Sequence, residues 1–132
     1  MIIADTSVWI DYFNGIDGPE TVLLDKKLDS DLVAVGDLIL LETLQGFKSD
    51  KDYKLAKNNL LLLDQHNFLN GDLVLKASEN YRKLRKKGIT IRKTNDVIIA
   101  SYCIEHKIPL LFSDRDFKPF VELLNLIPVL KT

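Results

Sequence analysis

The chain has 132 residues, 46% hydrophobic and 28% charged, which predicts a single soluble globular domain over residues 1–132. Its formal net charge of −1 excludes a general attraction to nucleic acid, so any phosphate binding must come from a local cluster of cations. The one cysteine excludes an internal disulfide and fits a reducing cytoplasm, and one cysteine with two histidines supplies too few ligands for a structural zinc site.

The first half of the chain predicts two short strands separated and followed by helices. The N-terminus has neither the basic region of a signal peptide nor the long apolar segment of a membrane anchor, so we expect a cytoplasmic protein. Short apolar runs predict buried strands at residues 2–4 and 32–35. Capping residues and helical spacing of apolar side chains predict helices over residues 6–13, 19–28, 37–47 and 50–63.

The second half begins with a longer helix over residues 71–87, whose apolar side chains fall on one face. Residues 94–104 form a helix that is apolar nearly all round, as expected of a central, buried helix that contains Cys103. A strand at 110–112, a last helix near 116–124 and a further strand at 127–129 complete the pattern. Because strands alternate with helices, we expect an α/β fold with a parallel sheet covered by helices on both faces.

Four acidic residues stand at unusual places in this pattern. Asp5 directly follows the first strand and Asp114 closely follows the 110–112 strand, so both lie at the carboxyl ends of strands, where open parallel sheets bind ligands. Asp96 lies in the first turn of the apolar helix, and Glu42 lies inside the helix that starts near Asp37.

Each aspartate alone has a simpler explanation, because aspartates commonly cap helices, which contributes about 0.5–2 kcal/mol. Together the four acids favour a shared site, since clustered carboxylates repel unless a cation lies between them. Oxygen ligands select Mg²⁺ or Mn²⁺ rather than zinc. Asp116 either reaches this site, directly or through water, or caps the last helix.

Four segments resemble the motifs of PIN-domain proteins, particularly the VapC toxins of toxin–antitoxin pairs. They are Asp5–Asp11 (DTSVWID), Glu42–Gly46 (ETLQG), Asn95–Ala100 (NDVIIA) and Leu110–Phe117 (LLFSDRDF). The similarity extends from the first residues to about Phe117 and agrees in order and spacing. The resemblance implies a PIN-like three-layer fold and an endoribonuclease dependent on Mg²⁺ or Mn²⁺. It also implies a homodimer inhibited by a VapB-type antitoxin.

The resemblance assigns metal binding and catalysis to Asp5, Glu42, Asp96 and Asp114. Glu42 can ligate the metal or act as the base for the attacking water, and the Asp114-Arg115-Asp116 spacing leaves open which aspartate lies closer to the metal. We expect hydroxyl and amide side chains to support the acids or bound waters from Thr6, Ser7, Asn95 and Ser113. Ser113 stands where relatives often carry threonine.

The strongest candidate for RNA binding is a run of cations without any acid from Arg82 through Asn95. The substrate-binding residues predicted within it are Arg85, Lys86, Arg92 and Lys93, which would guide a phosphate backbone toward Asp96. The same run is equally well explained as the solvated C-terminal end of a helix, where cations favour the helix dipole.

Two other functions compete with a ribonuclease. A haloacid-dehalogenase-type phosphohydrolase also begins with an aspartate after its first strand, but it needs a second aspartate two residues later, where this chain has Ser7. A non-catalytic PIN-like module for regulation or dimerisation would not need all four acids, and all four are present.

Overall fold

A computed structural model of the chain describes residues 1–130, in which four parallel strands form one sheet in the order β3-β2-β1-β4. The strands are β1 (Ile2–Ala4), β2 (Val33–Gly36), β3 (Asp64–His66) and β4 (Leu110–Leu111). The helices are α1 (Thr6–Phe13), α2 (Pro19–Asp29), α3 (Asp37–Gln45), α4 (Asp50–Leu60), α5 (Gly71–Lys86), α6 (Thr94–His106) and α7 (Lys118–Leu124), with a 3₁₀ turn at Arg115–Phe117.

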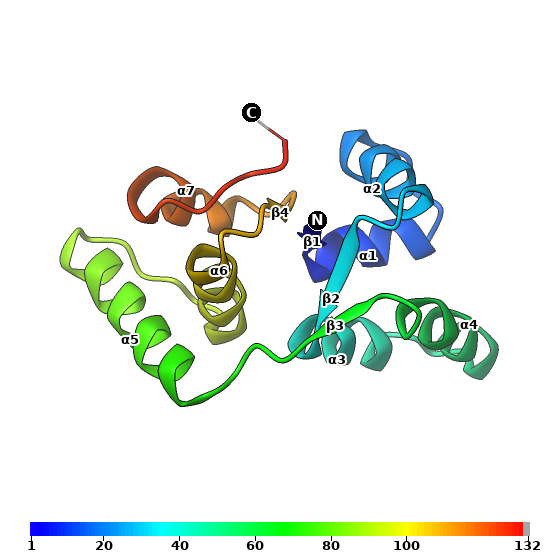
Figure 1. Cartoon of the computed structure of the whole chain (residues 1–132), viewed down its shortest axis with the longest axis horizontal. Coiled ribbons are helices and arrows are strands. Elements are labelled where there is room, and N and C mark those ends of the chain that lie inside the picture. The colour runs from blue at the N-terminus through cyan, green and yellow to red at the C-terminus, as the bar shows by residue number, and fades with distance from the viewer. Residues whose placement is uncertain (131–132) are drawn as a thin grey trace.

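The helices divide into two groups about the strands. Figure 1 shows α1 to α4 on one side of β2 and β3, and α5, α6 and α7 on the other. The core side chains of β1, β2 and β4 are fully buried, which is why these strands consist of apolar runs. The prediction of an α/β fold with a parallel sheet between helical layers is therefore confirmed.

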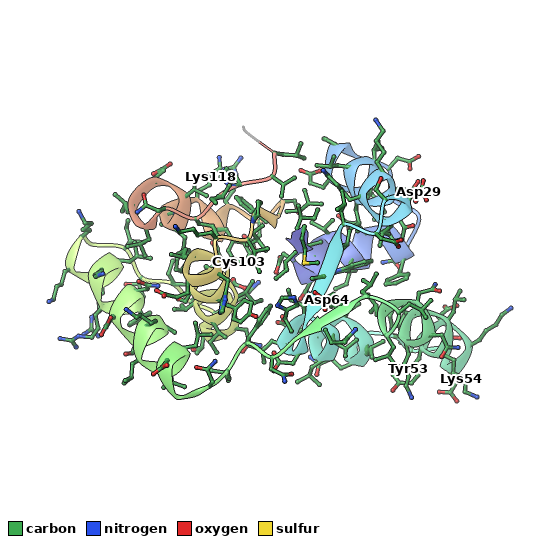
Figure 2. The ribbon with its side chains drawn as sticks, viewed as in Figure 1. Asp29, Tyr53, Lys54, Asp64, Cys103 and Lys118 are labelled. Carbon is green, nitrogen blue, oxygen red and sulfur yellow. The ribbon has the colours of Figure 1, made fainter. Side chains whose placement is uncertain are left out.

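Helix α6 is the central helix that the sequence predicted. Its residues 96–103 are all buried, from Asp96 at the start to Cys103 near the end. Figure 2 places Cys103 on α6 in the middle of the molecule, and burial raises the pKa of its thiol to about 12. Cys103 is therefore a core residue, as its place in an apolar helix indicated.

Several predicted elements differ in extent from those of the structure, and one strand was missed. The helix predicted over 50–63 ends at Leu60, and strand β3 follows at Asp64–His66. This strand is polar and largely exposed because it lies at the edge of the sheet, so it carries no apolar pattern. The strand predicted at 127–129 is a single bridge between Leu110 and Pro128.

Strand β3 is attached to the rest of the molecule through side chains as well as through its pairing with β2. His66 Nδ1 lies 2.7 Å from the hydroxyl oxygen of Tyr102 on α6. His66 Nε2 lies 3.0 Å from a carboxylate oxygen of Asp64. Figure 2 shows Asp64 on this strand. His66 thus links the sheet edge to α6.

Gly36, at the end of β2, provides a stability test of this packing. A Cβ at Gly36 would lie 1.8 Å from the fully buried Phe68 ring, so Gly36→Ala must displace that ring or the strand. We expect Gly36→Ala to lower the free energy of unfolding by about 1–3 kcal/mol in urea titrations. Gly71→Ala is the control, because its Cβ would meet nothing within 4 Å and α5 favours alanine there. Equal stability of the two variants would contradict this account.

Candidate metal centre

The parallel pairing of β1 with β4 brings two of the predicted acids together. Ala4 pairs with Leu111, and the amide of Asp5 donates a 2.8 Å hydrogen bond to the carbonyl of Leu111. The chain therefore leaves both strands at the same edge of the sheet, with Asp5 beginning α1 and Asp114 beginning the 3₁₀ turn.

Asp96 joins this cluster from the first turn of α6, and Glu42 joins it from α3. Burial, reinforced by the negative charges of Asp5, Asp114 and Glu42 and opposed by Lys93, raises the pKa of Asp96 from 3.8 to about 7. Burial also raises the pKa of Asp5, opposed by hydrogen bonds and reinforced by Glu42. All four predicted acids thus lie close enough to act on one another electrostatically.

Three of the four predicted supporting residues hydrogen-bond to the acids, and the fourth, Ser113, lies beside one of these three. Thr6 donates a 2.8 Å hydrogen bond to Glu42 Oε1, and the Asn95 amide donates one of 3.4 Å to Glu42 Oε2. Ser7 donates a 2.9 Å hydrogen bond to Asp5 Oδ2, and its hydroxyl lies 3.5 Å from that of Ser113. These contacts hold the carboxylates in place from three different elements of the chain.

Both aspartates of the Asp114-Arg115-Asp116 segment belong to the cluster. One carboxylate oxygen from each of Asp96, Asp114 and Asp116 lies within 4.8 Å of the other two, a separation that one metal ion can bridge. Asp114 Oδ1 also accepts a 2.9 Å hydrogen bond from the amide of Asp116. Asp116 therefore lies close enough to Asp96 for both carboxylates to contact one ion.

Helix capping explains only part of this arrangement. Asp114 does cap the 3₁₀ turn through the amide of Asp116. Asp5 is the N-cap residue of α1, but its side chain makes no capping hydrogen bond. Asp96 Oδ2 is buried without a hydrogen-bond partner among the described residues, which is costly for a carboxylate. A cation bound beside Asp96 would supply the missing partner, and the oxygen donors around it suit a hard divalent ion.

The predicted substrate-binding cations lie in two different places. Lys93 Nζ is 3.7 Å from Asp114 Oδ2, and an Arg92 guanidinium nitrogen is 4.0 Å from Asp116 Oδ2, so both pair with the acids. Arg85 lines a cavity between α5 and α6, whereas Lys86 lines a separate hollow near Leu124. The pairing of Arg92 and Lys93 with the acids was not predicted, because a run of cations in sequence does not show which carboxylates it will meet.

Comparison with known proteins agrees with the fold. The PIN-domain family model matches residues 2–122, and the chain belongs to that family. It is 28% identical over 128 residues to the VapC ribonuclease Mb1587 of Mycobacterium bovis and to ribonuclease VapC11 of Mycobacterium tuberculosis, with 96% of each chain covered. The prediction of a PIN-domain chain related to VapC proteins is confirmed.

Solved structures with the same fold include VapBC2 from Rickettsia felis bound to a DNA fragment from its promoter. The TM-score is 0.75 at 22% identity, and the match covers 97% of both chains. FitAcB from Neisseria gonorrhoeae has a TM-score of 0.75 at 16% identity over 97% of this chain and 96% of that one. A toxin–antitoxin complex from Klebsiella pneumoniae has a TM-score of 0.72 at 16% identity over 100% of both chains.

Within residues 1–130, no helix is both long enough and apolar enough to cross a lipid bilayer.

The raised pKa of Asp96 predicts how the metal-free protein responds to pH. The folded chain binds the Asp96 proton with a pKa of about 7, against 3.8 for a free side chain, so stability is lost as pH rises through that interval. Asp96→Asn removes this loss. With EDTA present, we expect the free energy of unfolding of Asp96→Asn, relative to that of the wild type, to be higher at about pH 8 than at about pH 4.5. Urea unfolding at both pH values measures the difference, and a difference independent of pH would contradict the prediction.

Proposed function

We propose that this chain is a VapC-type endoribonuclease, the toxin of a type II toxin–antitoxin system, which hydrolyses RNA phosphodiester bonds with Mg²⁺ or Mn²⁺. The proposal depends most on one observation: the buried Asp96 carboxylate has an oxygen without a hydrogen-bond partner and faces three other acids. The proposed ribonuclease activity is supported by the VapC relatives, which are named ribonucleases and match this chain over 96% of their length. We assign metal binding and catalysis to Asp5, Glu42, Asp96 and Asp114, with Asp116 as a further ligand.

The cluster fits a divalent cation better than it fits the metal-free state. Two or more carboxylates within reach of one ion satisfy the preference of Mg²⁺ and Mn²⁺ for oxygen ligands. When bound there, such an ion lowers the pKa of a coordinated water and neutralises charge at the phosphate. The same ion would favour the ionised forms of Asp5 and Asp96, which burial alone disfavours.

The chain's own residues hold the acids and receive the substrate. Thr6 and Asn95 each donate to one oxygen of Glu42, which fixes the plane of its carboxylate. Ser7 orients Asp5 in the same way. Lys93 and Arg92 are largely exposed beside Asp114 and Asp116. Each cation can leave its carboxylate partner and bind a phosphate of the RNA backbone instead. Arg85, at the end of α5, extends this positive path, whereas Lys86 lines the separate hollow near Leu124.

A phosphohydrolase of the haloacid-dehalogenase type has no support at the same site. The residue two positions after Asp5 is Ser7, and its hydroxyl donates to the Asp5 carboxylate instead of supplying an acid. Since the four acids and their hydrogen-bonding neighbours are all assembled, a non-catalytic PIN-like module is also the weaker alternative.

A VapB-type antitoxin and a second copy of the chain complete the proposal. Similar structures carry the descriptions VapBC2 and toxin–antitoxin complex, which supports an antitoxin partner. Exposed leucines on α4 and just beyond its end, including Leu55, Leu61 and Leu62, offer apolar surface for such contacts. We place the protein in the cytoplasm, since its proposed RNA substrate lies there.

The first test is cleavage of RNA by protein purified free of any antitoxin. With Mg²⁺ we expect the wild type to cut total RNA. We expect Asp5→Asn and Asp96→Asn to be slower by at least about 100-fold, because each loses a metal ligand and even the loss of a residue that supports a ligand typically costs 10–100-fold. EDTA should suppress cutting by the wild type.

Asp29→Asn is the matched control, because Asp29 lies exposed at the end of α2, as Figure 2 shows. This variant should cut at the wild-type rate. Equal rates for all four proteins would refute the site assignment, and cutting in EDTA would refute the dependence on a metal.

The second test concerns the toxin assignment. Expression of the wild-type chain alone should slow the growth of a bacterial host, because its RNA is degraded, and Asp96→Asn should not. Co-expression of a small open reading frame neighbouring the gene should restore growth. Normal growth of a host that accumulates the folded wild-type protein would exclude the toxin role and leave the ribonuclease role intact.

A further inference from the structure

A cavity of about 470 Å³ lies between α5 and α6, outside the carboxylate cluster. Its inner wall is apolar and buried, formed by Ala77 of α5 together with Val97 and Ile98 of α6. The exposed side chains of Arg82 and Arg85 line its outer part. A volume of this size, with an apolar wall and few polar groups, is typical of sites that hold a small organic group.

The cavity and the carboxylate cluster share the first turns of α6. Thr94, the first residue of that helix, lines the cavity, as do Val97 and Ile98, which directly follow Asp96. Because an α-helix rises about 1.5 Å per residue, these side chains lie within about 3 Å of Asp96 along the helix axis. At about 3.6 residues per turn, Thr94 and Ile98 point to a different face of α6 from Asp96, so a chain that passes over the start of α6 can reach the acids on one face and the cavity on the other.

Among the described residues, no carboxylate lines the cavity, whose polar side chains are those of Ser78, Tyr81, Arg82, Arg85 and Thr94. Within the part of the chain that the structure describes, no carboxylate oxygen lies within 4.0 Å of the Arg82 or Arg85 guanidinium. The Tyr81 ring also lines the cavity, and the Arg85 Cζ is 5.7 Å from the centre of that ring. Cations without an acidic partner beside an aromatic ring are the groups with which proteins bind single-stranded nucleic acid.

We propose that this cavity holds an unpaired base of the RNA, one that adjoins the phosphate cleaved at the Asp96 site. Arg82 and Arg85 contact the phosphates that flank this base, and the Tyr81 ring and the apolar wall contact the base itself. The inference rests on the proposed ribonuclease function and adds to it a selectivity for RNA that is single-stranded beside the cleaved bond.

A protein side chain is the other candidate occupant. Leu69 and Val74 at the cavity are about half exposed, so apolar contacts with a protein are available there. The charge favours RNA, because the two guanidinium groups have no acidic partner among residues 1–130 and the neighbouring cations Arg92 and Lys93 continue toward the acids. The experiment below distinguishes the two occupants.

The test uses a short single-stranded oligoribonucleotide that the wild type cuts, and a series in which each base in turn is removed while its ribose and phosphate remain. For the wild type, removal of one base beside the cleaved phosphate should lower kcat/KM roughly 5- to 150-fold, and removal of distant bases should not. Ser78→Trp fills the cavity from an exposed position on α5. Ser78→Trp should cut the intact oligonucleotide with the kcat/KM that the wild type has for the oligonucleotide lacking that base. Removal of the base should not lower the kcat/KM of Ser78→Trp any further.

Leu75→Trp is the matched control, because Leu75 is exposed on the same helix and does not line the cavity. It should keep both the wild-type rate and the effect of removing the base. Arg82→Gln, which fills nothing and leaves the core unchanged, should lower kcat/KM several-fold more than Lys76→Gln, an equal loss of charge on α5 outside the cavity. This second pair tests the proposal even when Ser78→Trp does not fold.

The outcomes separate the two proposals. No cleavage of any RNA by the wild type with Mg²⁺ would refute the ribonuclease and this inference together. Cleavage in which no single base matters, or in which Ser78→Trp responds to base removal as the wild type does, would refute this inference alone. The cavity would instead be assigned to a protein contact if Ser78→Trp changes the oligomeric state, measured by light scattering, and still cleaves RNA at the wild-type rate.

Discussion

The site depends first on the parallel pairing of β1 with β4. That pairing, with Ala4 opposite Leu111, makes Asp5 and Asp114 leave the sheet at the same edge. Two carboxylates held there by backbone geometry cannot separate to relieve their repulsion unless strand pairing is lost. Burial is the first cause of the raised pKa values of Asp5 and Asp96, and the charges of neighbouring acids add to it. A protein that retains such a cluster gives up stability for a function, and a divalent cation is the simplest compensation.

The central helix supplies the second constraint. Residues 96–103 of α6 are buried although Thr94 at its start is exposed, so the helix holds Asp96 of its first turn in the interior at the sheet edge. An acid at this place cannot turn toward solvent without moving the core. Asn95, the residue before it, reaches Glu42 on α3, which connects the two helical layers across the site. The rigidity of the site therefore comes from the hydrophobic core.

A net charge of −1 conceals a separation of charge within the molecule. Acids gather at the sheet edge, while the cations from Arg82 to Lys93 occupy the end of α5 and the connection to α6. Arg92 and Lys93 join the two regions by pairing with Asp116 and Asp114. In this arrangement a polyanion can approach along the cations and reach the acids only where a metal ion neutralises them.

The sequence by itself determined the α/β class, three of the four strands and the four acids, because apolar runs, helical spacing and residues at strand ends are local patterns. It did not predict β3, whose polar residues form a strand only because β2 offers them a free edge. Nor did it decide that Arg92 and Lys93 meet acids more than 20 residues away, or that α5 and α6 leave a cavity beside Asp96. Such contacts are set by how the elements pack, since residues distant in sequence become neighbours only when the core forms.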